Sequence, residues 1–270
     1  MTVNSYLQVL SSSAVIRDQE KESIQKSIAT LQQRLDQHFG NDITDHFIFG
    51  SYTRGTILPR SMDEHSDIDY MVVFGETSSS PQTYLNRLRR FVSIYYSRSQ
   101  ISQSAPTIVL SLNHIKFELV PAIDSWWSGL RIPAKRSELD DWIQTNPNDF
   151  NETLISTNKS NNNLIKPMIR LVKYWNARNG YLFESFTLER HLAEKSYFWI
   201  GGIWEPGQLK DYFFDAIGSL GYNGRDPKYK IDAIKRAHEL SDQAQRLISR
   251  GQEGQAESVI YRLLPAPISA

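Results

Sequence analysis

Two segments of the chain decide its fold: Phe47-Ile-Phe-Gly-Ser51 and, fifteen residues further on, Ser66-Asp-Ile-Asp-Tyr-Met-Val-Val-Phe74. The first predicts a short strand over residues 46–49 that ends in a tight Gly-Ser turn, from which another short helix can follow. The second predicts a strand over residues 67–74, because apolar and acidic residues alternate at its beginning. A Gly-Ser turn after one strand and acidic residues at the start of the next make this region the candidate functional site.

Two aspartates stand at the start of the second strand. Side chains alternate along a strand, so Asp67 and Asp69 face one side of it. Ile68 and Tyr70 face the other side. Like charges this close repel each other unless a cation neutralises them. Phosphoryl transfer uses such cations, since two magnesium ions about 3.5 to 4 Å apart can activate an attacking hydroxyl and stabilise a leaving pyrophosphate, and magnesium prefers oxygen ligands.

A third carboxylate is available on a later strand. Residues 107–112 and 114–120 alternate with a period of two and predict an antiparallel hairpin around Asn113. Glu118 lies on the polar face of this hairpin, and its strand is expected to end at Pro121. If that strand lies beside the first two, Glu118 completes the ligand set with the two aspartates.

The Gly50-Ser51 turn fits a phosphate site, because glycine lets backbone amides approach phosphate oxygens and the following helix presents its positive end. Each feature also has an ordinary interpretation. Asp-x-Asp is common in surface strands, Gly-Ser is a common turn, and Glu118 can be a solvated residue on a half-exposed strand. The three in this order favour the catalytic interpretation, with Asp67, Asp69 and Glu118 as metal ligands.

The other elements expected from the sequence are mainly helices. Residues 14–39 predict a long amphipathic helix that stops at Gly40-Asn41. Ser80 and Pro81 predict the N-cap and first turn of a helix that runs to about residue 97. Beyond about Pro133 the strand signal disappears, and a polar loop is expected at residues 156–163. Helices are predicted over residues 137–145, 163–178, 185–199, 209–220 and 227–250.

The predicted fold class is α+β. The chain of 270 residues is long enough for two lobes that share a cleft. We expect residues 1–133 to form a catalytic lobe with a mixed sheet, helices and the long N-terminal helix. Residues 134–270 are expected to form a helical lobe, with the active site in the cleft between the two.

Composition limits the classes of partner. Thirty basic residues balance thirty acidic ones, so any phosphate binding must be local rather than a property of the whole surface. The chain has no cysteine, which excludes disulfides, thiolate metal sites and a cysteine nucleophile. No apolar run approaches the ~18 residues of a membrane span, and the first residues lack the pattern of a signal peptide. We therefore expect a cytoplasmic protein without a membrane partner.

Longer strings resemble a known family. Residues 49–51, 67–69 and 117–122 are similar to the signature of the DNA polymerase β-like nucleotidyltransferases. Residues 50–56, 118–122, 173–176 and 185–189 narrow the resemblance to the bacterial cyclic oligonucleotide synthases of the SMODS type, relatives of cyclic GMP-AMP synthase and oligoadenylate synthase. The resemblance covers most of the chain, from the first long helix to about Trp199.

The resemblance implies a polymerase β-like lobe and a helical lobe enclosing two nucleotides. It assigns Mg²⁺ or Mn²⁺ to the three carboxylates, the triphosphate to Gly50 and Ser51, and further phosphates to Lys173 and Ser185. Many relatives carry aspartate where this chain has Glu118, a change that leaves the ligand chemistry intact. The zinc-dependent DNA-sensing element of the animal enzyme is absent, so we expect no stable DNA partner.

Residues of the expected helix 163–178 give separate support. Lys166, Arg170 and Lys173 follow one another at spacings of four and three, apart from the apolar stripe of the same helix. Such a basic stripe can bind phosphate if it faces a cleft, or it can be a solvated helix face. Ser185 can hold a phosphate or cap its own helix.

The function that the resemblance implies is synthesis of a cyclic di- or trinucleotide second messenger from nucleoside triphosphates (ATP, GTP, UTP or CTP). The diffusible product would activate a downstream effector of bacterial anti-phage defence (CBASS). Two alternatives remain: a nucleotidyltransferase with a macromolecular acceptor such as a tRNA end or a protein, and a catalytically silent nucleotide-binding module. Neutral charge disfavours a tRNA substrate, and retention of three carboxylates disfavours a silent module.

Overall fold

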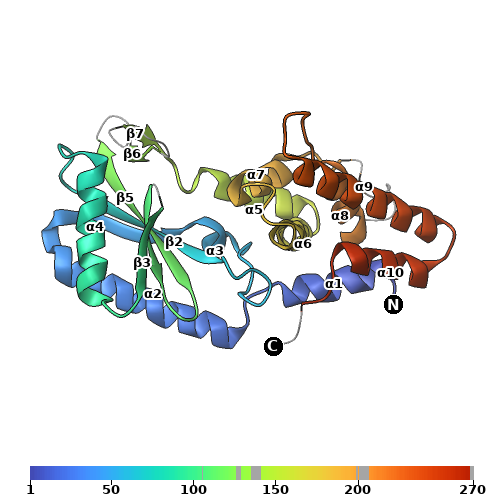
Figure 1. Cartoon of the computed structure of the whole chain (residues 1–270), viewed down its shortest axis with the longest axis horizontal. Coiled ribbons are helices and arrows are strands. Elements are labelled where there is room, and N and C mark those ends of the chain that lie inside the picture. Colours follow the sequence, from blue (N-terminus) through green and yellow to red (C-terminus); the bar gives the residue numbers. More distant parts are fainter. Residues whose placement is uncertain (105, 126–128, 135–140, 199, 201–206, 268–270) are drawn as a thin grey trace. The chain divides into compact units, whose positions relative to one another are not determined.

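The computed structural model describes residues 1–104, 106–125, 129–134, 141–198, 200 and 207–267 (Figure 1). The chain folds into two compact units. The sheet unit contains Arg17–Arg60 and His65–Asp149, and the helical unit contains Met1–Ile16, Ser61–Glu64 and Phe150–Ala270. The expected lobe boundary after Pro133 remains a prediction.

The sheet unit is built on a mixed sheet. Strands follow one another across it in the order β1-β2-β5-β4-β3, with β6 beside β5 and β7 beside β6. Of the pairs formed by the described residues, β2 and β5 are parallel and the others antiparallel. This confirms the α+β class. The strands are β1 (Ile43–Phe49), β2 (Asp67–Phe74), β3 (Gln100–Ser104), β4 (Thr107–Ser111), β5 (Lys116–Ser125), β6 (Gly129–Pro133) and β7 (Trp142–Gln144).

Two helices, α2 (Asp18–Phe39) and α4 (Pro81–Tyr95), pack on the sheet and on each other (Figure 1). The apolar stripe predicted for the first helix is its buried side, with every member at most 8% exposed: Ile24, Ile28, Leu31, Leu35 and Phe39. Every second residue of β2, from Ile68 to Phe74, is fully buried on the covered face. The opposite face of β2 therefore carries the two aspartates.

A polar chain fixes β2 against β1 and α2. The side chain of His46 lies 2.7 Å from the Tyr70 hydroxyl through Nδ1 and 2.8 Å from Asp36 Oδ1 through Nε2. A carboxylate only accepts, so Nε2 donates to Asp36, and in the tautomer with its proton on Nε2 the other ring nitrogen accepts from Tyr70. Burial raises the pKa of Tyr70 above its ordinary value, which keeps this donor protonated.

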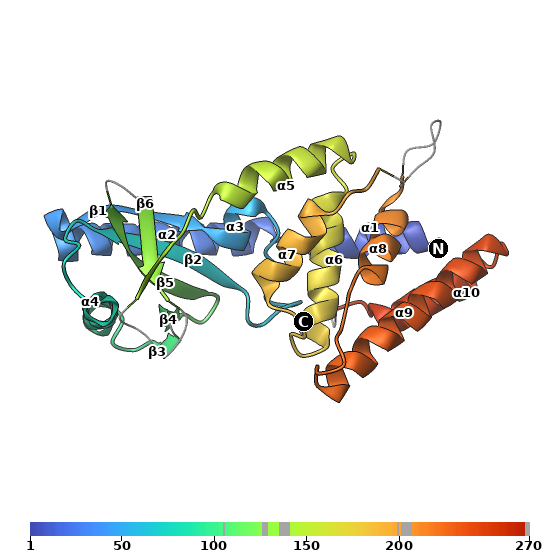
Figure 2. The ribbon, with the colours of Figure 1, turned by 90° about the horizontal axis from the view of Figure 1, so that it is seen from above.

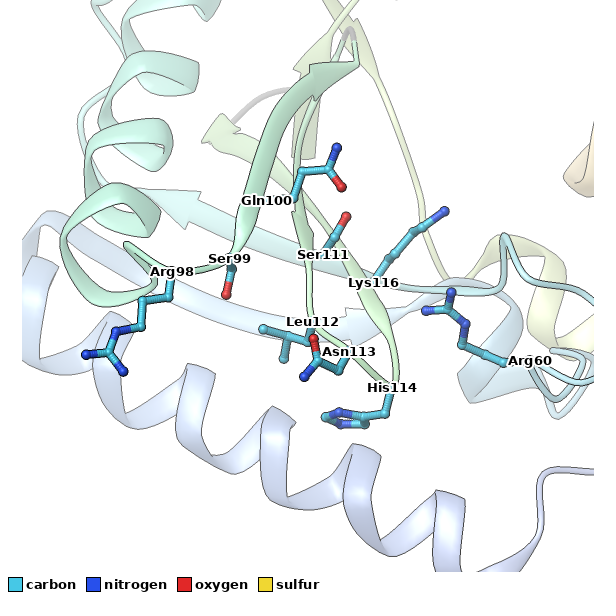
Figure 3. A pocket seen from close by; sticks show the side chains of 9 residues that line it. All are labelled: Arg60, Arg98, Ser99, Gln100, Ser111, Leu112, Asn113, His114 and Lys116. Carbon is cyan, nitrogen blue, oxygen red and sulfur yellow. The ribbon is translucent and has the colours of Figure 1, made fainter.

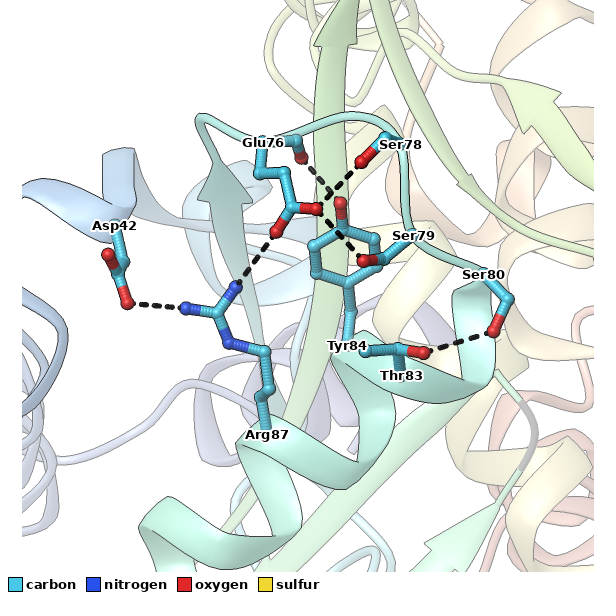
Figure 4. A network of polar contacts seen from close by, with 8 residues as sticks. All are labelled: Asp42, Glu76, Ser78, Ser79, Ser80, Thr83, Tyr84 and Arg87. Carbon is cyan, nitrogen blue, oxygen red and sulfur yellow. Dashed lines mark hydrogen bonds and ion pairs between the residues drawn. The ribbon is translucent and has the colours of Figure 1, made fainter.

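The far end of β2 is held by a second polar network, shown in Figure 4. Arg87 of α4 donates to Asp42 at 2.6 Å and lies 3.9 Å from Glu76, which follows β2. Asp42 belongs to the short 3₁₀ helix Gly40–Asp42, and its carbonyl accepts the N–H of Gly75 at 3.0 Å. The aspartate strand is thus tied to neighbouring elements in its middle and just beyond its far end.

The strand of Glu118 is longer than expected. The hairpin around Asn113 is confirmed, because β4 and β5 pair antiparallel. Pro121 does not end β5, which runs on to Ser125. β4 pairs with β5 only as far as Leu119 and β6 begins to pair at Ile123, so proline, which lacks an N–H, stands between the two partners on that edge.

The helical unit surrounds α6 (Figure 2). This helix contacts α1, α7 and α8, while α9 packs along α10. Buried Val3, Leu7 and Leu10 place the N-terminal helix in the same core as the C-terminal ones. None of the described helices is long and apolar enough to cross a membrane. The helices are α1 (Val3–Ser13), α5 (Asp149–Ser160), α6 (Ile165–Arg178), α7 (Ser185–Glu194), α8 (Leu209–Gly218), α9 (Lys228–Ser249) and α10 (Glu253–Leu263).

Several elements differ from the sequence prediction. Residues 142–144 form β7 rather than a helix, and residues 137–140 of that expected helix lie outside the described residues. The expected loop at 156–163 is helical up to Ser160, because α5 buries Phe150 and Leu154. Helices α1, α5 and α10 and strands β3 and β6 were not predicted. Ser80 occupies the N-cap of α4 but makes no capping bond.

Replacing Tyr70 with phenylalanine removes the hydroxyl donor to His46 and leaves that ring nitrogen without its bond. We expect the free energy of unfolding to fall by about 1 kcal/mol. Denaturant unfolding measures this change, with Tyr229→Phe as the matched control, because the Tyr229 side chain is 66% exposed. Equal stability of the two variants would show that the His46 contact contributes nothing.

Candidate active site

The parallel register of β2 and β5 places acidic residues next to each other. Asp69 stands opposite Glu118, and Asp67 stands opposite Lys116. Partners in a register lie on the same face of a sheet, so the three carboxylates share the face that α2 and α4 leave uncovered. All three are half-buried. The expectation that Glu118 lies on a strand beside the aspartates is therefore met by the geometry.

Gly50 lies directly against Asp69. Phe49 pairs with Asp69 across β1 and β2, and the chain then turns into α3 (Gly50–Arg54). Gly50 has a φ of +75°, and a Cβ built on it would lie 1.8 Å from Asp69 Oδ2. Only glycine fits there, since any side chain would both strain the backbone and collide with the carboxylate. The Gly-Ser turn and the acidic strand thus form one site.

The backbone of Ser51 is fixed by the residues that follow. Its carbonyl accepts the N–H groups of Thr56 at 3.0 Å and Ile57 at 3.1 Å. These bonds close the turn after α3, while the Ser51 side chain remains half-exposed. A rigid backbone with an accessible hydroxyl beside the carboxylates is suited to hold a ligand in one orientation.

The donor set suits a hard divalent cation, because it consists of carboxylate oxygens on adjacent strands. No group of three His, Asp or Glu side chains in the described part of the chain is already gathered in a metal-binding arrangement. The carboxylates are neighbours through the register but do not form a closed cage. Mutual repulsion keeps such groups apart until a cation draws them together. Asp67, Asp69 and Glu118 are the residues that would hold it.

A cavity of about 400 Å³ opens over this face of the sheet. Its walls come from β2, β5, β4 and β3, and its volume lies within the range of small-ligand sites, roughly 300–1,000 Å³. Thr107 reaches the same face and donates to Glu118 at 3.4 Å. The lining residues are His65, Asp67, Gln100, Ser102, Ser104, Val109, Ser111, Lys116 and Glu118.

Some of these neighbours were not predicted. Lys116 is two residues before Glu118, so the same alternation that placed Glu118 also places this ammonium on the carboxylate face. Its Nζ donates to His65 Nδ1 at 3.2 Å. The serines of β3 carried no signal, because their strand is short and has a single apolar residue, Ile101, too few for a recognisable alternation. A cation and several hydroxyls thus accompany the carboxylates.

The basic residues of α6 are more buried than those of a solvated helix face. Lys173 is only 7% exposed, and its Nζ lies 3.9 Å from Glu189 on α7, whose side chain is 1% exposed. Burial lowers the pKa of Arg170 to about 10, so it remains a cation at neutral pH. The stripe is therefore not a solvated helix face. Lys173 forms a buried ion pair that joins two helices.

Ser185 is exposed at the first residue of α7. It does not cap the helix, because the N-cap is Glu184, whose carboxylate accepts the N–H of Thr187 at 3.1 Å. The capping interpretation of Ser185 is wrong. Its hydroxyl is accessible at the start of the helix that carries Glu189.

Comparison with known sequences gives three findings. The sequence profile of the "Second Messenger Oligonucleotide or Dinucleotide Synthetase domain" matches residues 1–158. A cyclic AMP-AMP-AMP synthase of Acinetobacter sp. is 27% identical over 158 residues, which are 56% of this chain and 45% of that protein. A probable cyclic nucleotide synthase of Bacillus cereus is 26% identical over 221 residues, 67% of this chain and 64% of that protein. The chain thus spans less than two thirds of either curated relative.

The fold is similar to that of a solved relative. The structure of the Bradyrhizobium diazoefficiens CD-NTase CdnG in complex with GTP superposes with a TM-score of 0.68, covering 97% of this chain and 98% of that one at 11% identity. The resemblance stated from the sequence is confirmed. Because its profile matches more than half of the 270 residues, the chain belongs to the family of Second Messenger Oligonucleotide or Dinucleotide Synthetase domains.

Proposed function

We propose that the chain is a metal-dependent nucleotidyltransferase that joins nucleoside triphosphates into a cyclic di- or trinucleotide second messenger. The observation that carries the proposal is the register that sets Asp69 beside Glu118, with Gly50 packed on the Asp69 carboxylate. Family membership supports it, as do the names of the curated relatives, which are cyclic nucleotide synthases.

Asp67, Asp69 and Glu118 are proposed to hold Mg²⁺ or Mn²⁺. When bound, the metal would lower the pKa of an attacking hydroxyl and neutralise charge on pyrophosphate. Gly50 and Ser51 are proposed to bind the triphosphate. The close contact of Gly50 with Asp69 places the backbone of this turn directly beside a carboxylate that would hold the metal. Lys173 and Ser185 remain proposed phosphate ligands.

The proposed reaction is an in-line attack. A ribose hydroxyl oxygen forms a bond to the α-phosphorus, and the bond from that phosphorus to the oxygen bridging to the β-phosphate breaks. Pyrophosphate carries away the electron pair, and the hydroxyl proton is released. The chain's own residues orient the two groups, which is the main protein contribution to such a transfer. A second reaction on the linear product would close the ring.

We further propose that the messenger is made in the bacterial cytoplasm and acts on an effector of anti-phage defence (CBASS). The same carboxylates would serve a macromolecular acceptor equally well, whereas a silent binding module would give no product. Mass spectrometry of the nucleotide pool after incubation with the four ribonucleoside triphosphates separates these cases. A cyclic product supports the messenger synthase.

Replacing Asp67 and Asp69 together with alanine should abolish pyrophosphate release in the presence of magnesium or manganese, because two of the three oxygen ligands are lost. Chelation of the metal should do the same to the native chain. A coupled pyrophosphate assay measures both. The matched control is Asp45→Ala with Asp124→Ala, which removes two exposed carboxylates from the same sheet. Retained activity in the first double variant would refute the assignment.

Substituting Gly50 with alanine should lower kcat/KM by about 100-fold, because the new Cβ must push Asp69 out of place by more than an ångström. Gly55→Ala provides the comparison. Gly55 has a similar φ of +71°, yet no atom lies within 4 Å of the Cβ position. Backbone strain is thus common to both variants and the Asp69 contact is specific to Gly50. Equal losses would count against the contact.

Lys173→Met should lower the free energy of unfolding by about 3–5 kcal/mol, since Glu189 is left buried without its cation. Lys173→Met combined with Glu189→Leu should recover most of that stability. If Lys173 also holds a phosphate, the recovered double variant keeps a raised KM for nucleoside triphosphate. A normal KM in this stable variant would restrict Lys173 to its ion pair.

A further inference from the structure

A second polar cavity, of about 600 Å³, adjoins the carboxylate cavity (Figure 3). The two share Gln100, Ser111 and Lys116, so they are neighbours on the same edge of the sheet. Figure 3 shows Arg60 and Arg98 on opposite sides of the turn that joins β4 and β5. We call this second cavity the basic cavity. Its lining residues are Arg60, Arg98, Ser99, Gln100, Ser111, Leu112, Asn113, His114 and Lys116.

The charge of the basic cavity is one-sided. Three of the nine lining residues are basic, namely Arg60, Arg98 and Lys116, and none is acidic. This excess is local, because the whole chain has equal numbers of basic and acidic residues. The carboxylate of Glu20 accepts the backbone N–H of Arg60 at 3.3 Å, but Glu20 does not line the cavity. Within the described residues, neither arginine side chain forms an ion pair.

The remaining lining residues offer hydrogen bonds. Ser99, Gln100, Ser111 and Asn113 are half-buried or exposed and present neutral donors beside the cations. His114 is held by a 3.0 Å contact between its Nε2 and the Ser27 hydroxyl. Cations surrounded by neutral donors suit phosphate oxygens, which accept several charge-assisted bonds at once.

The volume argues for more than one phosphate. A cavity of about 600 Å³ exceeds what a single anion fills and lies within the range for nucleotide-sized ligands, roughly 300–1,000 Å³. Its cations come from three separate segments: after α3, after α4 and at the start of β5. A ligand with several phosphates along its length can contact all of them.

We propose that the basic cavity binds the phosphate groups of an oligonucleotide, apart from any phosphate that reacts at the carboxylates. Two sources share this chemistry: a linear oligonucleotide formed in the adjoining cavity, and an RNA strand from solution. Binding requires the cations of the basic cavity and neither the carboxylates nor a metal. The proposal therefore stands or falls separately from the catalytic assignment.

The test measures binding in the full chain carrying Asp67→Ala and Asp69→Ala, with chelator present, so that catalysis is absent. The probes are a linear 5′-triphosphorylated diadenylate and a short single-stranded RNA, titrated by calorimetry at several salt concentrations. Adding Arg60→Gln with Arg98→Gln should weaken binding at least about tenfold, because two charge-assisted contacts are lost. The dependence of affinity on salt should become shallower as well.

Arg90→Gln in the same background is the matched control, because Arg90 is exposed on α4 and does not line the cavity. It should leave both affinities within twofold. Tighter binding of the diadenylate supports the linear product as the source, and tighter binding of RNA supports the external strand. The proposal is overturned if the parent binds neither probe, or if the glutamine pair binds as the parent does.

Discussion

The parallel pairing of β2 with β5 is the constraint on which the rest of the structure depends. Parallel strands cannot be joined by a hairpin, so the chain must leave the sheet and return. Here that connection contains α4, which covers one face of the sheet. It also contains the strands β3 and β4, which extend the sheet toward the cavities. A shift of the register by one residue would turn Glu118 to the opposite face from Asp69.

The face of these strands that carries the carboxylates changes character along its length. Its first residues are the carboxylates, and further along the same strands it becomes apolar, with Met71, Val73, Val120 and Ala122 forming a buried cluster. Phe47 and Phe49 of β1 pack on this cluster. One end of each strand is thus dry and closely packed, while the other meets the cavity. The packed end holds the backbone of each strand in place, so the side chains at the polar end stand on a fixed backbone, which a site of defined geometry needs.

How much the sequence predicts depends on whether an element has an apolar face. The alternation in β2 and β5 and the stripe of α2 specify strand and helix directly, and with them the shared face of Asp67 and Asp69. Strand β3 is polar apart from Ile101 and is held by its partner β4, so no local pattern marks it. The burial of Lys173 could not be predicted either. Helical spacing shows which side of a helix a residue occupies, but it does not show that a second helix carrying Glu189 packs against that side.

The path of the chain limits how recombination can exchange its two units. It passes between the two units at four places: after Ile16, Arg60, Glu64 and Asp149. A single crossover between two related genes can therefore not replace one whole unit and leave the other unchanged. A fragment that stopped at residue 158 would keep α1 but lose α6, α8 and α10, against which its buried side packs. Recombination that keeps the helical unit intact must carry the codons for residues 1–16 together with those for residues 150–270, which couples two separate stretches of the gene.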